Sequence, residues 1–292
     1  MRFLFVFICV VFQTVPANAE TVFTVRGPEY PGDTRMEYDY DLMKLALDLT
    51  VESHGPYKLV KTPIGLNYKR AMEFAQKRTF PNFFMRNVVS QDALQELTAV
   101  KFPVERGIAG YRVAFIKPNL QEEIGQVENI SDLRKYDIIQ GIGWPDNLIL
   151  KANGLRVLAG PSFSSIRDMV VNDRAQLFLR GANEILQEYQ QQTDDIPLAV
   201  EKHVLIYYPF PRLLFTAKEN TEAANRVEIG LLKACKNGSF TELWEKHFLK
   251  NLEKLDLKSR KTILLKNPFL ERVEELLEEF KKLPPECRPL AL

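Results

Sequence analysis

Predicted strands and helices alternate along the first hundred residues after residue 19. Short apolar runs bounded by Gly, Pro or Asn predict strands, and apolar residues at helical spacing predict helices. The predicted strands cover 22–26, 57–61 and 82–89, and the helices that follow them cover 38–52, 67–76 and 91–97. Because a strand that is followed by a helix returns beside its predecessor, this β-α-β-α-β-α order predicts a parallel sheet.

A second α/β series begins with the apolar stretch 110–118, a predicted strand bounded by Gly110 and Pro118. Further predicted strands cover 137–140, 175–179, 204–208 and 213–216, and predicted helices cover 131–136, 146–153, 164–171, 182–191, 221–236 and 240–248. The full length of 292 residues suits two lobes with sizeable cores.

Charge and residue spacing exclude several functional classes. The chain has 39 Lys and Arg against 38 Asp and Glu, whereas a general nucleic-acid binder shows a basic excess. His54, His203 and His247 are scattered, and no C-x-x-C pair occurs, so the sequence predicts neither a metal site nor a zinc motif. We also expect no cofactor.

The first 19 residues have the features of a secretory signal peptide. Arg2 precedes the apolar run 3–12, and Ala17-Asn18-Ala19 follows as a small-x-small cleavage site. The apolar run is too short to remain as a membrane anchor. We therefore predict cleavage between Ala19 and Glu20 and a soluble exported protein with 38 basic and 38 acidic residues.

Two cysteines remain after that cleavage, Cys235 and Cys287. Export permits a disulfide, which would contribute on the order of 3–4 kcal/mol by closing a long loop. The alternative is that Cys235, which lies near Leu231 and Leu232 on a predicted helix, is a small core residue. The helical spacing favours this second interpretation.

The C-terminal stretch predicts an amphipathic helix. Asn267 can cap it, Pro268 can begin it, and the apolar residues from Phe269 to Phe280 fall on one face. We expect this face to pack on the body of the protein. A helix that binds a partner is the alternative.

Several motifs together resemble a known family. They include the block 38–42, the predicted strand 110–117, Tyr208-Pro209-Phe210-Pro211 and the helical runs 223–231 and 238–240. In this order the chain from 21 to 248 resembles the type II periplasmic solute-binding proteins, in their amino-acid-binding branch (family 3). The stretches 141–146 and 266–270 are similar to a subgroup of exported binding-protein-like sequences.

The resemblance implies an α/β fold of two lobes with a central cleft and two crossover strands. Lobe one would comprise 20–112 and 207–255, lobe two 113–206, and a C-terminal extension 256–292. The crossings would lie near 110–118 and 203–211. A small-molecule ligand would bind in the cleft and draw the lobes together by hinge closure.

The chain departs from this family at one functional position. Amino-acid binders of the family usually carry an Arg after the third strand, and this Arg pairs with the ligand carboxylate. The corresponding stretch 90–95 contains no Arg. An acidic ligand would therefore need another cation in the cleft.

Candidate ligand-binding residues follow from the rule that ligands meet the carboxyl ends of parallel strands. Glu29 and Tyr30 follow the first strand and can supply an acid and an aromatic wall, or form a solvated turn. Arg86 can replace the missing carboxylate anchor. Tyr207, at the second crossing, is a candidate for an inward-facing ring.

The turn Gly141-Ile142-Gly143 precedes two further candidates. Trp144 can stack on a ligand or belong to a lobe core, and the helix start at Asp146 can offer amides to an anion or simply follow a tight turn. The turn is not a nucleotide fingerprint because a third Gly is missing. Arg180 can grip a carboxylate, or pair with Glu184 four residues later.

The leading hypothesis is an exported solute-binding protein that captures a small polar or acidic solute for transport or sensing. Its partners would be the solute and a membrane permease, as in an ABC transporter, or a sensor. We expect a monomer in the periplasm and no nucleic acid. The alternatives are a hydrolase-like enzyme on the same scaffold, which no catalytic motif supports, and an interaction protein without a ligand.

Overall fold

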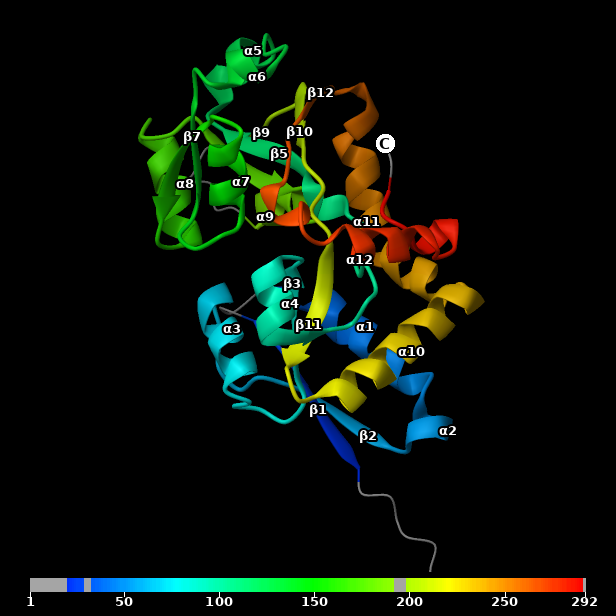
Figure 1. The fold of residues 1–292 in the computed structure, drawn as a ribbon. Helices are drawn as coiled ribbons and strands as arrows, with labels where there is room; N and C mark the ends of the chain where they lie inside the picture. Colours follow the sequence, from blue (N-terminus) through cyan, green and yellow to red (C-terminus); the bar gives the residue numbers. More distant parts are fainter. Residues whose placement is uncertain (1–19, 29–32, 192–197, 291–292) are drawn as a thin grey trace, which may run out of the picture.

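The computed structural model describes residues 20–28, 33–191 and 198–290, which form two α/β lobes stacked on one another (Figure 1). The predicted signal peptide and its cleavage site at residue 19 lie outside the described residues. None of the described helices is both long and apolar enough to cross a membrane.

The sheet of lobe one has five strands among the described residues, in the order β2-β1-β3-β11-β4. These strands are β1 (Thr21–Val25), β2 (Tyr57–Lys61), β3 (Phe83–Val88), β4 (Leu97–Ala99) and β11 (Arg212–Ala217). β1 runs parallel to both β2 and β3, which confirms the predicted parallel arrangement. β11 enters from the other lobe and runs antiparallel to β3 and β4.

Helices cover this sheet on both sides. They are α1 (Glu37–Asp48), α2 (Val51–His54), α3 (Tyr68–Gln76), α4 (Gln91–Glu96), α10 (Thr221–Asn237) and α11 (Ser239–Leu255). Leu42 and Leu47 of α1 are fully buried against Leu231 of α10. Gly230 allows this close approach, because a Cβ there would stand 2.1 Å from the carbonyl oxygen of Ala46.

The sheet of lobe two has the order β12-β10-β5-β8-β6-β7, and a short strand β9 pairs with β5. The strands are β5 (Tyr111–Ile116), β6 (Asp137–Gly141), β7 (Arg156–Gly160), β8 (Leu177–Gly181), β9 (Ala199–Val200), β10 (Val204–Tyr207) and β12 (Lys261–Leu264). Its helices are α5 (Gln121–Ile124), α6 (Ile130–Leu133), α7 (Asp146–Ala152), α8 (Phe163–Val171) and α9 (Ile185–Gln190). Apolar cores lie on both faces of this sheet.

Two of the chain segments that pass between the lobes touch each other at the hinge. The first crossing leads into β5, and the second runs from Tyr208 to β11. The amide of Tyr208 donates to the carbonyl of Gly110 at 3.2 Å. Gly110 has to be glycine here, since a Cβ would lie 2.3 Å from the carbonyl oxygen of Tyr208. The predicted lobe boundaries, 20–112 with 207–255 and 113–206, remain a prediction.

The C-terminal segment differs from the single helix predicted from residue 267 to residue 280, and that prediction is wrong in its extent. Residues Pro268–Leu270 form a 3₁₀ turn, and α12 spans only Glu274–Lys281. The apolar stripe divides because Phe269 packs in lobe two whereas Val273 packs in lobe one. The strand β12 was not predicted.

Cys235 and Cys287, which are 52 positions apart in the sequence, form a disulfide with Cα atoms 6.1 Å apart. Both residues are buried in the core of lobe one. The interpretation of Cys235 as an unpaired core residue is therefore wrong, although its predicted burial holds. Helical spacing placed Cys235 in the core and said nothing of which chain segment meets it there.

Candidate functional site

The described residues of the two lobes enclose a cleft of about 830 Å³. Lobe one contributes side chains from the ends of β1 and β3 and from the start of α1, and lobe two contributes the ends of β6, β7 and β8. The cleft therefore lies at the carboxyl ends of parallel strands, where open α/β sheets bind their ligands.

Four of the seven predicted site residues line this cleft: Arg86, Trp144, Asp146 and Arg180. Tyr207 is not among the described residues that line it, because its ring packs on that of Tyr111 with centroids 4.5 Å apart. Glu29 and Tyr30 lie outside the described residues. A role for any of them in ligand binding stays a prediction.

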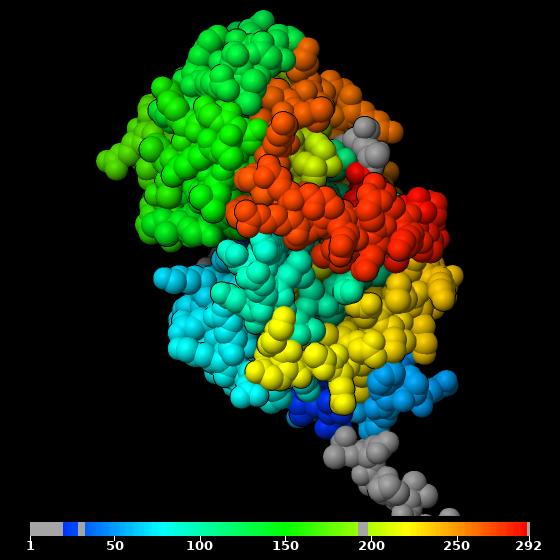
Figure 2. Space-filling view, viewed as in Figure 1, coloured from blue at the N-terminus to red at the C-terminus, as the bar shows by residue number. Residues whose placement is uncertain are grey.

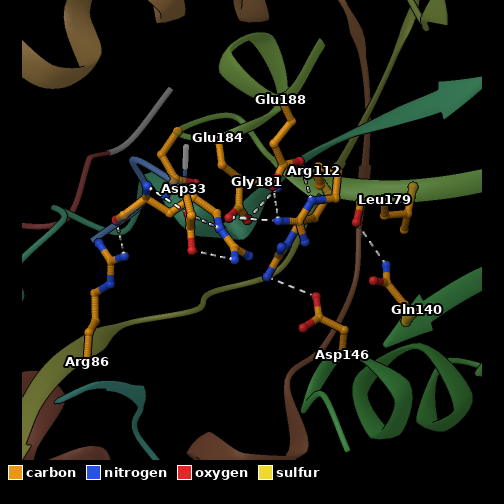
Figure 3. A network of polar contacts seen from close by, with 12 residues as sticks. Asp33, Arg86, Arg112, Gln140, Asp146, Leu179, Gly181, Glu184 and Glu188 are labelled. Atoms are coloured by element: carbon orange, nitrogen blue, oxygen red, sulfur yellow. Dashed lines mark hydrogen bonds and ion pairs between the residues drawn. The ribbon is translucent and has the colours of Figure 1, made fainter. Parts of the chain in front are cut away.

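Basic side chains outnumber acidic ones in the lining of the cleft. Eight of its described lining residues are basic and four are acidic, which leaves an excess of four positive charges. The basic residues are Arg26, Arg35, Lys69, Arg86, Arg112, Arg167, Arg180 and Arg212, and the acidic residues are Asp39, Asp146, Glu184 and Glu188. Figure 3 shows several of these side chains converging from both lobes.

Arg180, at the end of β8, is held by two carboxylates. Its Nε and Nη2 donate to the carboxylate of Glu188 at 2.7 and 2.5 Å, and Nη2 lies 2.9 Å from Glu184. The guanidinium also lies 4.8 Å from the ring centroid of Trp144. Arg180 thus lines the cleft and also makes the alternative pair with Glu184, so its guanidinium is already well supplied with acceptors.

The pKa values of the two acids around Arg180 are shifted in opposite directions. Burial alone raises the pKa of a carboxyl, but Arg180, Arg212 and further arginines lower that of Glu184 to about 2. Burial raises the pKa of Glu188 and outweighs the opposing charge of Arg180. Glu184 is therefore the firmly ionised member of the pair.

Arg112, in the first crossing strand, is a cleft residue that the sequence analysis missed. Its Nη2 lies 2.9 Å from Asp146, which also accepts a hydrogen bond from the hydroxyl of Tyr208 at 2.5 Å. The guanidinium lies 4.7 Å from the ring centroid of Phe210. The side chain is buried, and its Nε has no hydrogen-bond partner among the described residues. A lone Arg inside an otherwise apolar strand was the available signal.

Glu105, just before the first crossing, organises two further arginines. Its carboxylate lies 2.6 Å from Arg86 and 2.6 Å from Arg212, and it accepts a hydrogen bond from Asn183 at 2.8 Å. Glu105 is 1% exposed and is not itself a lining residue. Arg86 also lies 3.2 Å from Asp39. This cluster joins lobe one to Asn183 of lobe two.

The turn before α7 fixes Trp144 at the cleft wall. The indole lies so close to Gly141 that a Cβ there would stand 2.3 Å from it. Asn147 closes the turn by donating to the carbonyls of Gly141 and Trp144 at 2.7 and 3.0 Å. The structure thus contains the tight turn, and an anion site at the start of α7 stays a prediction.

The described residues contain no cluster of His, Cys, Asp and Glu that could hold a metal ion. The described lining residues present guanidinium groups, carboxylates and aromatic rings, together with one lysine and several hydroxyl and amide side chains. Such a set suits the recognition of carboxylates or other oxyanions, which arginine binds in bidentate geometry.

Solved structures similar to this chain are two-lobed binding proteins. An ancestral arginine-binding protein bound to arginine matches with a TM-score of 0.56 and 13% identity, over 78% of this chain and 99% of its own. A Salmonella typhimurium periplasmic binding protein with high arginine specificity matches with a TM-score of 0.56 and 11% identity, over 79% and 100%. No protein-family profile and no curated protein match the chain.

A third similar structure is an ancestral amino-acid-binding protein described as a precursor of cyclohexadienyl dehydratase. It has a TM-score of 0.55 and 14% identity, over 78% of this chain and 95% of its own. These likenesses show that the chain has the two-lobed fold of type II periplasmic solute-binding proteins, as the sequence resemblance predicted.

Proposed function

We propose that this protein is an exported solute-binding protein that captures a small acidic or polar solute between its lobes by hinge closure. The observation that carries the proposal is the buried guanidinium of Arg112, which lines the cleft at the hinge and whose Nε donor has no partner in the part of the chain that the structure describes. Since a buried donor without a partner costs free energy, a ligand acceptor at this position would be stabilised.

An acidic solute is supported by how the cleft carboxylates are used. Asp39 faces Arg86, Asp146 faces Arg112, and both Glu184 and Glu188 face Arg180, each within 3.2 Å. Each lining carboxylate among the described residues therefore already has an arginine close by, although Oδ1 of Asp39 accepts no hydrogen bond, and the excess of four basic side chains favours an acidic solute. The proposed solute differs in this respect from the arginine of the two similar proteins.

Hinge closure is supported by the division of the lining residues between the lobes. Arg86 and Arg212 belong to the sheet of lobe one, whereas Arg180 and Trp144 belong to lobe two. A solute that contacts both sets would favour the closed state, because those contacts are complete only when the lobes meet. We further propose a periplasmic location, monomeric protein, and delivery of the solute to a membrane permease or sensor.

Catalysis is the second candidate, and the similarity to a dehydratase precursor favours testing it. A general acid or base must be free to exchange a proton with the substrate. The carboxylates of the cleft instead face arginines, as described above. We therefore propose binding without turnover.

The test is calorimetric titration and thermal unfolding of the mature protein with succinate, citrate and inorganic phosphate, and with arginine and glutamine for comparison. We expect stabilisation by at least one acidic probe and weakening of that binding about ten- to a hundredfold in Arg112→Gln, as for loss of a charged hydrogen bond. Arg70→Gln, on the exposed surface of α3, is the matched control.

Three other results would count against parts of the proposal. Stabilisation by arginine or glutamine alone would contradict the acidic ligand while leaving solute binding intact. Chemical conversion of a bound probe would support the enzyme. If no probe binds and native mass spectrometry of freshly purified protein shows no co-purified small molecule, the binding function itself is contradicted.

A further inference from the structure

The C-terminal segment, residues 256–290, contacts first lobe two, then lobe one, and finally the hinge between them. Figure 2 shows this segment, in orange and red, lying across the junction of the two lobes. We propose that it braces the hinge as a further connection between the lobes, in addition to the two crossings, and limits how far the cleft opens. The proposal rests on contacts of this segment and does not depend on the identity of the solute.

The first part of the segment is built into lobe two. β12 pairs in parallel with β10, from Val204 opposite Lys261 to Tyr207 opposite Leu264. The buried guanidinium of Arg260 secures the entry to this strand, since it donates to the carbonyls of Leu255 and Glu201 at 2.8 and 2.7 Å. Ile263 and Leu265 are buried in the core of lobe two, so this end of the segment moves with that lobe.

The segment then passes from lobe two to lobe one within a few residues. Phe269 still packs in lobe two, whereas Val273, Leu276 and Phe280 are buried in a core of lobe one. Leu270 already packs against the same lobe-one core, so the crossing falls between Phe269 and Leu270. Residues 270–272 together span at most about 10 Å when fully extended. The disulfide between Cys287 and Cys235 attaches the far end of the segment covalently to α10 of lobe one.

The segment also bonds directly to both crossings. Asn267 donates to the carbonyl of Pro209 in the second crossing at 2.8 Å. At the first crossing the amide of Leu290 donates to the carbonyl of Arg106 at 2.8 Å, and the carbonyl of Leu290 accepts from the hydroxyl of Tyr111 at 3.0 Å. Arg106 lies four residues before the hinge glycine, Gly110, and Tyr111 follows that glycine directly.

These contacts restrict the residues that have to move when the lobes open. A hinge works because a few residues absorb large changes of φ and ψ. Here the same residues are tied to a segment that is anchored in both lobes. Opening would break the bonds of Leu290 or Asn267, or would stretch the short passage 270–272. The brace therefore shifts the conformational equilibrium toward the closed arrangement.

The test severs the brace after folding. A protease recognition sequence replaces residues 270–272, and the folded protein is cut there with its disulfide intact. The part before the cut stays in the sheet of lobe two, and the part after it stays bound to lobe one through Cys287. Spin labels on Lys77→Cys of lobe one and Lys135→Cys of lobe two, both exposed, report the distance between the lobes.

We expect the ligand-free cut protein to show a broader distribution of label distances, shifted to longer values than in the same protein before cutting. A distribution that does not change on cutting would overturn the brace. If the cut protein unfolds, an uncut variant with a flexible Gly-Ser insertion at 270–272 replaces it, with the same expectation and the same contradicting result. Neither readout requires a ligand, so failure of the proposed solute binding would be seen separately.

Discussion

Asn183 of lobe two donates a hydrogen bond of 2.8 Å to Glu105 of lobe one, and both side chains are buried. Glu105 simultaneously faces Arg86 and Arg212. The carboxylate of Glu105 thus positions two cleft arginines, and it accepts the hydrogen bond of Asn183 only when lobe two lies close to lobe one. Opening the lobes would leave one acceptor site of Glu105 to water.

Asn183→Ala removes the lobe-two partner of this carboxylate while leaving its arginines in place. We expect the free energy of unfolding to fall by about 1 kcal/mol, as for a typical hydrogen bond, and the radius of gyration of the ligand-free protein to increase. Chemical denaturation and small-angle X-ray scattering measure the two effects. A radius of gyration equal to that of the wild type would show that this bond does not hold the lobes together.

Arg180→Met tests whether this arginine is chiefly a ligand anchor or a partner for its neighbouring acids. The substitution leaves Glu184 and Glu188 buried without their countercharge, so we expect a loss of about 3–5 kcal/mol in the free energy of unfolding. Thermal and chemical unfolding measure it. The double variant Arg180→Met with Glu188→Gln should recover part of the loss, and a single variant as stable as the wild type would contradict the structural role.

Much of the fold could be predicted because the signals for it are local. Apolar runs and turn residues gave the parallel strands β1, β2 and β3 and the helices between them. The strand β12 was not predicted because it has only four residues, begins with a lysine and is stabilised by pairing with β10. The disulfide was not predicted because it joins residues that are 52 positions apart, and local spacing does not indicate which segments meet.

The candidate site was predicted in part for the same reason. Arg86 and Arg180 lie near the carboxyl ends of β3 and β8, and Trp144 follows β6. Ligands of open α/β sheets bind at such strand ends. The role of Glu105 has no local signal, since Arg86, Asn183 and Arg212 come from three separate parts of the sequence. Arg112 also depends on a distant partner, because Asp146 lies on α7, which follows β6, the next strand along the chain.

The Cys235–Cys287 disulfide predicts a measurable contribution to stability. Replacing both cysteines by serine removes a cross-link that closes a loop of 52 residues, and the expected loss is about 4 kcal/mol in the free energy of unfolding. Denaturant titration of the oxidised wild type and the double variant measures the difference. The control is the double variant Ser165→Ala with Ser239→Ala, which changes two serines elsewhere. Equal stability of the cysteine variant and wild type would contradict the prediction.

Glu184 predicts a specific dependence of stability on pH. Burial would raise the pKa of its carboxyl above the usual 4.5, but Arg180 and the other cleft arginines lower it to about 2. A folded-state pKa below the unfolded value means that ionised Glu184 stabilises the fold. This contribution is complete above about pH 4.5 and is lost as the pH falls toward 2. In Glu184→Gln the decline of stability over this interval should be shallower than in the wild type, as measured by urea denaturation at a series of pH values.

Glu222→Gln, on the exposed first turn of α10, is the matched control and should follow the wild-type curve. Parallel curves for wild type and Glu184→Gln between pH 4.5 and 2 would show that Arg180 does not stabilise the ionised carboxylate.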